Sequence, residues 1–486
     1  MKEIVSWDAI ELSRAIADRR VSCTEVMEAY LEHIDRINPH VNAIVGAQDP
    51  ELSLRQARER DEQLGRGERL GWMHGFPHAV KDLTEAEGLP WTEGSPLHAE
   101  RVAEQDALLV RRVKAAGAVV IGKTNTPEFG LGSQTYNPVW GTTGNAYDPS
   151  RTAGGSSGGA ASALALRMLP VADGSDYMGS LRNPAAFNNV LGMRPSWGLV
   201  PSPGFSAQLS TAGPMARTTE DLAWLLSVMA GPDPGAPLAG AGGGARFREG
   251  LGGGEGREGS GHGSRSGFHG VRIAWVGDWD GYLATDPGVL DVCRSSFAAF
   301  EALGCEVTEA RPEFPPEEIW RTFLTWRGLA NLERHGLYAD PHSRGQLKPE
   351  AVWEIEGGLS LGALEIAAAG ESRDRWYAAL TEFFERYDYV LAPSAQVFPF
   401  AKETHWPYRV GGREMDTYHR WMETVVPWTL AGVPVIAMPA GFGPGGLPMG
   451  VQLIGRHRGD WELLRLAHAY ERETGWVERV RPALLG

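Results

Sequence analysis

Apolar residues recur at helical or strand spacing along most of the chain. From Asp8 to about Arg36 they return every three or four positions, which predicts two helices, with a capping box at Ser22 and Glu25 and an end at Asn38-Pro39. The same spacing predicts helices at 51–64, 107–116, 286–303 and 462–474 and a mostly helical region at 317–376. Short apolar and β-branched runs predict strands at 41–45, 79–80, 271–276 and 305–307, and a buried strand leading into a loop at 118–125. This alternation indicates an α/β protein whose site lies on the loops of a sheet.

The richest stretch of small residues runs from Arg151 to Pro195. It opens with Gly154-Gly155-Ser156-Ser157-Gly158-Gly159, which predicts a tight loop feeding a helix that Pro170 stops, and a second serine-bearing turn is predicted at 174–180. Glycine lets the backbone approach a ligand closely, so N–H groups there can converge on a developing negative charge. For each of the two segments, an ordinary surface turn without a functional role remains the alternative interpretation. A phosphate-binding loop is disfavoured because no Gly-Lys-Ser/Thr ending follows.

A serine nucleophile needs a base, and no histidine motif stands beside either turn. Lys81 is the better candidate, because the short buried strand at Ala79 and Val80 would place it where desolvation lowers its pKa toward neutrality. Lowering the pKa of a lysine from about 10.4 to about 7 corresponds to about 4 to 5 kcal/mol, which is within the range of shifts that burial causes. Lys123, at the end of another predicted strand, is a rival base.

These three motifs together resemble the amidase signature family of serine hydrolases. The resemblance rests on 154–159, on 174–182 and on Val80-Lys81-Asp82, and extends over most of the chain to 450–455. It implies an α/β amidase signature fold, with a large mixed twisted sheet covered by helices on both faces. It also implies a single domain over residues 1–486.

The resemblance implies a catalytic triad. Ser180 would be the nucleophile that forms the acyl-enzyme, Ser156 the middle serine held by a cis peptide bond, and Lys81 the general base. The same resemblance implies that an oxyanion hole is formed by the backbone N–H groups of Tyr177, Met178, Gly179 and Ser180.

Three further expectations concern the surroundings of this triad. Asp176 and Arg182 are expected to support the turn as an ion pair. Met178 stands where the family usually has glycine, so its side chain can intrude on the acyl pocket. The candidate substrate-binding positions are Gln134, Tyr136 and Ser157, although turn packing is the favoured role for Gln134 and Tyr136.

The charge and composition of the chain limit the kinds of binding partner it can have. A net charge of -15 argues against nucleic acid and against an anionic membrane, since both need a basic surface. The scattered Cys23, Cys293 and Cys305 are typical of reduced thiols in a cytoplasmic protein and form no metal-ligand spacing. No signal peptide or spanning segment is predicted. Residues 232–270, rich in glycine and serine, are expected to form a flexible surface insertion.

Three functions remain open from the sequence. The first is a cofactor-independent hydrolase of small-molecule amides, with aryl amides, carbamates and esters all within reach of the same chemistry. The second is the A subunit of a tRNA-dependent glutamine amidotransferase, against which Tyr177-Met178 and the aromatic C-terminal region count. The third is a non-catalytic scaffold with the same fold. No metal or cofactor is implied, and a homodimer is compatible with the sequence, which does not fix the oligomeric state.

Overall fold

An eight-stranded mixed sheet lies at the centre of the computed structural model, which describes residues 3–204, 209–240, 242–251 and 267–486. The strand order is β10-β9-β11-β15-β14-β7-β8-β6, with β10, β9 and β11 parallel and every other neighbouring pair antiparallel. The strands are β6 (Ala172–Asp176), β7 (Leu191–Arg194), β8 (Thr211–Ala216), β9 (Arg272–Trp275), β10 (Glu306–Glu309), β11 (Tyr389–Pro393), β14 (Val435–Phe442) and β15 (Pro448–Ile454). The predicted α/β class with a large mixed sheet is confirmed.

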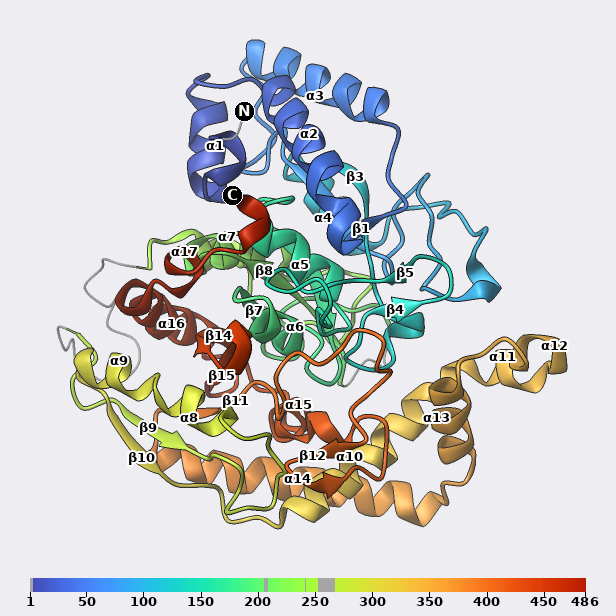
Figure 1. Ribbon diagram of the computed structural model, residues 1–486, viewed down its shortest axis with the longest axis vertical. Coiled ribbons are helices and arrows are strands. Elements are labelled where there is room, and N and C mark those ends of the chain that lie inside the picture. Colours follow the sequence, from blue (N-terminus) through green and yellow to red (C-terminus); the bar gives the residue numbers. More distant parts are fainter. Residues whose placement is uncertain (1–2, 205–208, 241, 252–266) are drawn as a thin grey trace.

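Helices cover this sheet on both faces. Helix α6 (Arg182–Phe187) and helix α16 (Asp460–Thr474) both contact β14 and lie on opposite sides of it (Figure 1). Helix α7 (Thr219–Met229) covers β7 and β8, while α8 (Val289–Arg294) contacts β11, β14 and β15. The sheet is therefore enclosed, which explains why every residue of β15 is buried.

A second, three-stranded sheet carries Lys81. Its order is β1-β3-β2, with β1 (Ile44–Val45) antiparallel and β2 (Pro77–Lys81) parallel to β3 (Val119–Thr124). Every residue of β2 is buried, and β2 packs against β6 of the large sheet. The end of β2 is thereby held beside the strand that leads to Ser180.

The N-terminal helices match the predicted pattern with one correction. They are α1 (Ala9–Ala17), α2 (Cys23–Val41), α3 (Pro50–Gly65) and α4 (Leu108–Ala115), and the Ser22–Glu25 capping box is present. The predicted end of α2 at Asn38-Pro39 is wrong. Because Pro39 lies in the last turn, little of the hydrogen-bond ladder is lost, and the helix ends instead at Asn42, whose φ is 52°.

Two other predictions also need correction. Residues 174–176 belong to strand β6, so the turn before Ser180 begins only at Tyr177. The single helix predicted at 286–303 is two helices, α8 and α9 (Phe297–Ala302). At the break, the hydroxyls of Ser295 and Ser296 donate to backbone carbonyls three residues earlier, an alternative to continuing the helix.

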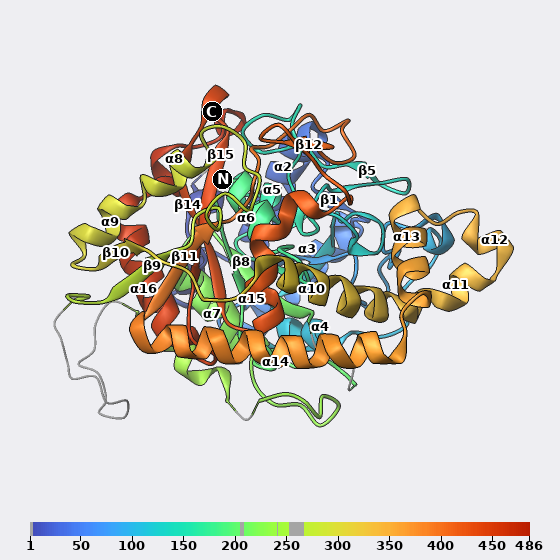
Figure 2. The same ribbon diagram turned by 90° about the horizontal axis from the view of Figure 1, so that it is seen from below.

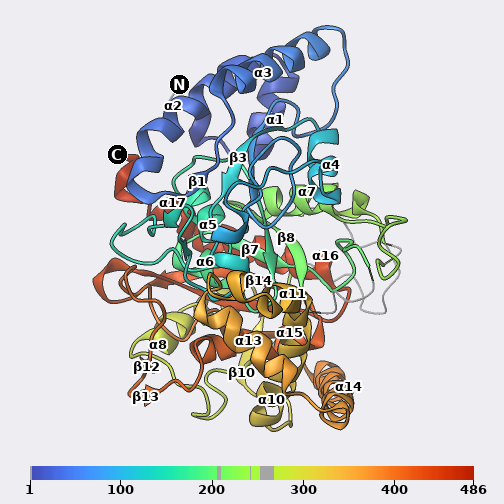
Figure 3. The ribbon, with the colours of Figure 1, turned by 90° about the vertical axis from the view of Figure 1, so that its right-hand side faces the viewer.

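The predicted helical region after residue 316 is present as several helices on the side of the sheet opposite α1–α3 (Figures 1 and 3). The longest, α14, runs along the edge of the molecule in Figure 2. Trp376 on α14 is fully buried, whereas Trp353 on α13 is exposed. The helices are α10 (Pro316–Asn331), α11 (His335–Ala339), α12 (Pro341–Arg344), α13 (Pro349–Leu359) and α14 (Ala363–Arg386).

The remaining elements are short. Helix α5 (Gly158–Ala165) ends before the predicted stop at Pro170. The others are β4 (Tyr136–Asn137), β5 (Gly141–Thr142), β12 (Arg409–Val410), β13 (Arg413–Glu414), α15 (Val426–Ala431) and α17 (Trp476–Arg479).

The predicted glycine-rich insertion, 232–270, is described only in part. Residues 241 and 252–266 lie outside the described residues. Within the described part, residues 244–248 form a short 3₁₀ helix, and its Phe247 is buried with its ring 6.5 Å from that of Trp461. This part of the insertion therefore packs on α16.

Candidate active site

The structure brings Lys81 and two serines of the glycine loop into contact. Lys81 Nζ, at the end of β2, lies 2.8 Å from Ser156 Oγ and 2.9 Å from Ser157 Oγ. All three residues are buried. Lys81 and these serines are some 75 residues apart in the sequence. They meet because β2 packs beside β6 and α5.

The backbone of the glycine loop has the predicted special geometry. The Gly155–Ser156 peptide bond is cis. Ser157 is the N-cap residue of α5, and its N–H donates to the Ser180 carbonyl at 3.2 Å, which joins the two serine segments. A Cβ on Gly159 would lie 2.3 Å from the Asn125 nitrogen, so the loop can pack this closely only with glycine there.

Ser180 follows the turn that leaves β6. Gly179, just before it, has a φ of 81°, and a Cβ there would lie 2.7 Å from Asn183 Oδ1. Ser180 retains 7% exposure, and its hydroxyl has no hydrogen-bond partner within the described part of the chain. The bond from the Ser157 N–H to the Ser180 carbonyl therefore joins the predicted nucleophile to the loop that contacts Lys81.

Burial controls the charge of Lys81. It lowers the pKa of the ammonium to about 7, while the negative charges of Asp173 and Asp176 oppose that shift. At neutral pH a substantial fraction of Lys81 is therefore the free amine, which can accept a proton. This matches the expectation drawn from its place at the end of a buried strand.

A buried ionic cluster supports the Ser180 turn. The Asp176 carboxylate accepts hydrogen bonds from the Arg182 guanidinium at 2.9 and 3.0 Å and pairs with Arg194 at 3.4 Å, with none of these side chains exposed. Burial alone would raise the pKa of Asp176, but the two guanidiniums hold it well below its ordinary value. The expected ion pair of Asp176 and Arg182 is present.

One of the four amides expected in the oxyanion hole has a partner in the protein. The Gly179 N–H donates to Asp176 Oδ1 at 2.9 Å. The N–H groups of Tyr177, Met178 and Ser180 have no acceptor among the described residues. Three neighbouring amides beside Ser180 are therefore available to an incoming oxygen.

The residues expected to bind substrate have other partners. Gln134 is buried, donates to the Lys402 carbonyl at 2.7 Å and accepts from Thr152. The Tyr136 ring stacks on that of His405 with their centroids 4.8 Å apart, and Tyr136 as a whole is half-buried. The contacts of Gln134 are those of turn packing, while Tyr136 remains partly exposed.

Lys123, the rival base, lies elsewhere. Its Nζ donates to the Thr84 carbonyl and is 3.9 Å from Asp82 Oδ1. Within the described residues it contacts neither Ser156 nor Ser180. The geometry therefore favours Lys81.

Sequence reasoning missed three residues around Lys81. Ser175 Oγ lies 3.1 Å from Lys81 Nζ, and His78 and Asp173 form a buried pair next to it. Interpreting 174–180 as a turn concealed the two that lie on β6, Asp173 and Ser175. Read as a strand, residues 173 and 175 share one face by the period of two, and that signal could have placed both beside β2.

Comparison with known proteins identifies the family. The amidase family model matches residues 25–464. The chain belongs to the amidase signature family.

This amidase signature protein is 34% identical to an acylamidase from Rhodococcus erythropolis, over 98% of this chain and 97% of the relative. It is 33% identical to the A subunit of the glutamyl-tRNA(Gln) amidotransferase of Cupriavidus metallidurans, over 97% of this chain and 98% of the relative. Among solved structures, 6-aminohexanoate cyclic dimer hydrolase with its substrate superposes with a TM-score of 0.84 at 26% identity, covering 99% of this chain and 100% of that one. The family and these relatives make the protein an amide-hydrolysing enzyme.

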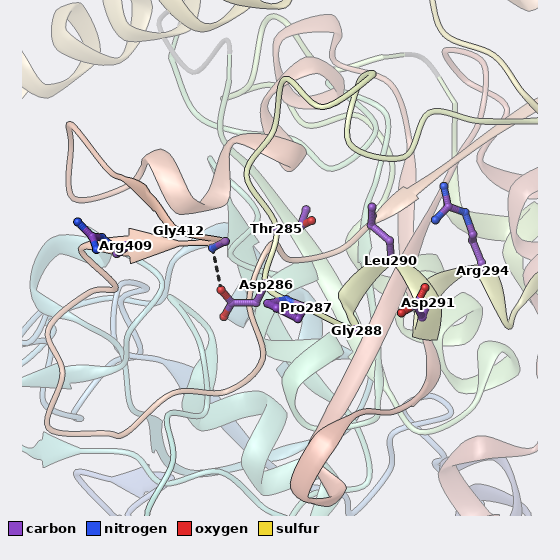
Figure 4. A pocket seen from close by; sticks show the side chains of 10 residues that line it. Thr285, Asp286, Pro287, Gly288, Leu290, Asp291, Arg294, Arg409 and Gly412 are labelled. Atoms are coloured by element: carbon purple, nitrogen blue, oxygen red, sulfur yellow. Dashed lines mark hydrogen bonds between the residues drawn. The ribbon is translucent and has the colours of Figure 1, made fainter.

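A separate surface pocket of this amidase signature enzyme lies away from the predicted site residues. It has a volume of about 540 Å³ and lies between the start of α8 and the β12–β13 hairpin. Figure 4 shows Asp286 reaching across it to the hairpin, where its Oδ1 accepts from the Gly411 N–H at 3.1 Å. No residue of the predicted site lines this pocket.

Across residues 3–204, 209–240, 242–251 and 267–486, no group of histidine, cysteine or acidic residues is arranged to hold a metal ion. In those ranges no helix has the length and apolar character to span a membrane. Cys23, Cys293 and Cys305 are buried free thiols.

Proposed function

We propose that this enzyme hydrolyses the C–N bond of small-molecule acyl amides through an acyl-enzyme on Ser180, with Ser156 and Lys81 as the proton relay. The observation that carries the proposal is the contact between a fully buried lysine and the hydroxyl of Ser156, at 2.8 Å. A lysine whose pKa is about 7 is half deprotonated at neutral pH. The acyl-amide class is suggested by the acylamidase relative.

The first chemical step moves two protons. The Lys81 amine accepts the proton of Ser156 while Ser156 accepts that of Ser180, and Ser180 Oγ bonds to the substrate carbonyl carbon. The proton then returns along the same path to the amine nitrogen as the C–N bond breaks. Water enters by the same relay, hydrolyses the ester on Ser180 and releases the acid.

The developing oxyanion needs fixed donors. We assign this task to the N–H groups of Tyr177, Met178 and Ser180, which no described residue occupies, while that of Gly179 is engaged by Asp176. Donors held rigidly in a buried site stabilise the transition state without reorganising. Esters and carbamates pass through the same tetrahedral oxyanion, so the site is expected to accept them to differing extents.

The test is turnover of an anilide such as p-nitroacetanilide by Ser180→Ala. The variant is expected to lose activity by at least about a thousandfold with its fold intact, because it lacks the nucleophile. Ser394→Ala is the matched control, since Ser394 is also buried and its hydroxyl has no partner among the described residues. Turnover by Ser180→Ala at the level of this control would overturn the proposal.

The second candidate is the A subunit of a tRNA-dependent amidotransferase, supported by a relative that is 33% identical over nearly its whole length. Such a subunit would release ammonia from glutamine for a partner. Glutaminase assays of the purified chain, alone and after co-purification, separate the two functions. Family membership as an amide-hydrolysing enzyme leaves the third hypothesis, a non-catalytic scaffold, without support.

A further inference from the structure

A buried carboxylate lies next to Lys81 and takes no part in the proposed proton relay. Asp173 Oδ1 is 3.0 Å from His78 Nε2, and Asp173 Oδ2 accepts from the Lys81 backbone N–H at 3.4 Å. His78, Lys81 and Asp173 are each at most 1% exposed. A carboxylate buried this fully is uncommon, because leaving water disfavours its charged form. Its position next to Lys81 therefore calls for a function.

We propose that Asp173, held in place by His78, is a positioning residue whose negative charge and bond to the Lys81 backbone set how readily Lys81 exchanges a proton with Ser156. The proposal rests on the function proposed above, in which Lys81 is the base. His78 and Asp173 act through Lys81 and touch neither of the relay serines.

The environment of His78 indicates the charge of this pair. His78 Nδ1 is buried and has no hydrogen-bond partner among the described residues. An imidazolium carries a proton on both nitrogens, so it would leave an N–H unsatisfied in the interior. A neutral ring that donates from Nε2 to Asp173 carries no proton on Nδ1, so no buried N–H is left without an acceptor. The geometry therefore favours a neutral His78 and an anionic Asp173.

Asp173 differs in this respect from the neighbouring carboxylate. Asp176 is paired with the guanidiniums of Arg182 and Arg194, which offset its charge locally. Within the described residues Asp173 has no arginine partner, so its charge acts on Lys81.

Other charged groups also face this region. On β3, Lys123 lies 3.9 Å from Asp82. Burial lowers the pKa of Lys123, and the negative charges of Asp82 and then of Asp173 oppose that shift. Asp173 has the same effect on Lys81, where its charge is the largest influence after burial. Asp173 therefore limits how far burial lowers the proton affinity of the proposed base.

Replacing Asp173 by asparagine preserves the shape of the side chain and removes its charge. The ammonium form of Lys81 then loses a stabilising anion, so Lys81 should deprotonate at a pH lower by about one unit. The acid limb of kcat/KM should move down by the same amount. A merely structural role would change stability or the plateau rate and leave both midpoints where they are.

The direct test is a titration of the full-length protein carrying ¹³C-labelled lysine, followed by NMR at the ε-carbons. The chain has few lysines, so the Lys81 signal can be assigned by its absence in Lys81→Arg; the lysines are Lys2, Lys81, Lys114, Lys123, Lys348 and Lys402. A midpoint about one pH unit lower in Asp173→Asn supports the proposal. An unmoved midpoint, or one that rises, overturns it.

A second variant guards against misfolding of Asp173→Asn. The double variant His78→Leu/Asp173→Ala removes both partners of the buried pair, which is tolerated better than removing one. It should lower the Lys81 midpoint in the same direction. The titration needs no turnover, so an active Ser180→Ala would refute the proposed function separately, while an unmoved midpoint would refute only this inference.

Discussion

The guanidinium of Arg182 and the carboxylate of Asp176 form an ion pair at 2.9 Å, fully buried, with Ser180 lying between them in the sequence. Arg182 also donates to the Val425 carbonyl at 2.9 Å and to Gln452 Oε1 at 2.8 Å. One side chain thus ties the Ser180 turn to β15 and to the segment before α15. The turn is held by charge in the interior rather than by the loop alone.

We expect Arg182→Met to lower the free energy of unfolding by about 3 to 5 kcal/mol, because it leaves the Asp176 carboxylate short of a buried partner. Urea denaturation followed by circular dichroism measures this change. Arg66→Met is the control: its pair with Glu68 is over half exposed and screened by solvent, so its loss should be much smaller than that of Arg182→Met. Similar losses in both variants would contradict the structural role of Arg182.

Lys81→Met should be more stable than the natural protein at neutral pH, although inactive. In the folded state burial lowers the pKa of Lys81 to about 7, whereas an unfolded lysine has a pKa of about 10.4. Between these two pKa values the unfolded chain binds more protons than the folded one, so the free energy of unfolding rises with pH. Below pH 7 the shift therefore destabilises the folded state by its full amount, and above the unfolded pKa this destabilisation vanishes.

The expected gain of Lys81→Met is about 4 kcal/mol near pH 7, falling to about 1 kcal/mol near pH 9.5. Urea denaturation at the two pH values measures it. Lys114→Met, which removes a partly exposed lysine, should show no such gain at either pH. A loss of stability in Lys81→Met at pH 7 would mean that Lys81 is buried as a well-compensated cation.

On the acid side of the pH–activity profile, the activity should depend on the loss of one proton, that of Lys81. Because the neutral amine of Lys81 is the proposed base, kcat/KM should rise with pH to a midpoint near 7 and then level off. Lys81→Arg keeps the positive charge but cannot act as a base, so it should lose activity about a hundredfold or more at every pH. A pH-independent rate between pH 5 and 9 would contradict Lys81 as the base.

Met178 is expected to restrict the acyl group. Its side chain is buried in the core, two residues before Ser180 in the sequence, at a position where the family resemblance implies glycine. Met178→Ala should raise kcat/KM for a hexanoyl anilide relative to an acetyl anilide by about tenfold, because it frees space for several methylenes. Met193→Ala, a buried methionine on β7, should cost stability and leave the acyl preference unchanged. Equal preferences in both variants would remove Met178 from the pocket.

Much of this site could be predicted from local sequence. Ser22 and Glu25 satisfy each other within one turn, and Lys81 follows a short apolar run, so neither prediction required knowledge of the tertiary fold. Ser156 and Ser180 were located by the motifs around them. The large mixed sheet followed from the resemblance and from the alternation of elements.

What could not be predicted depends on pairings between distant segments. Asp173 lies beside His78 only because β6 packs against β2, about 95 residues away in the sequence. Gln134 donates to the backbone carbonyls of Lys402 and Thr404, a contact that no local pattern predicts. The break between α8 and α9 depends on two serine hydroxyls bonding backward, which competes closely with helix continuation.

The most direct test is to quench the enzyme within milliseconds of mixing with an activated anilide or ester and to locate the acyl group by peptide mass spectrometry. We expect a single acylated residue, Ser180, whose adduct forms and decays at rates that account for turnover. Accumulation should fall sharply in Lys81→Met and in Ser156→Ala. Turnover without an acylated Ser180, or an acyl group carried by another residue, would contradict the central claim.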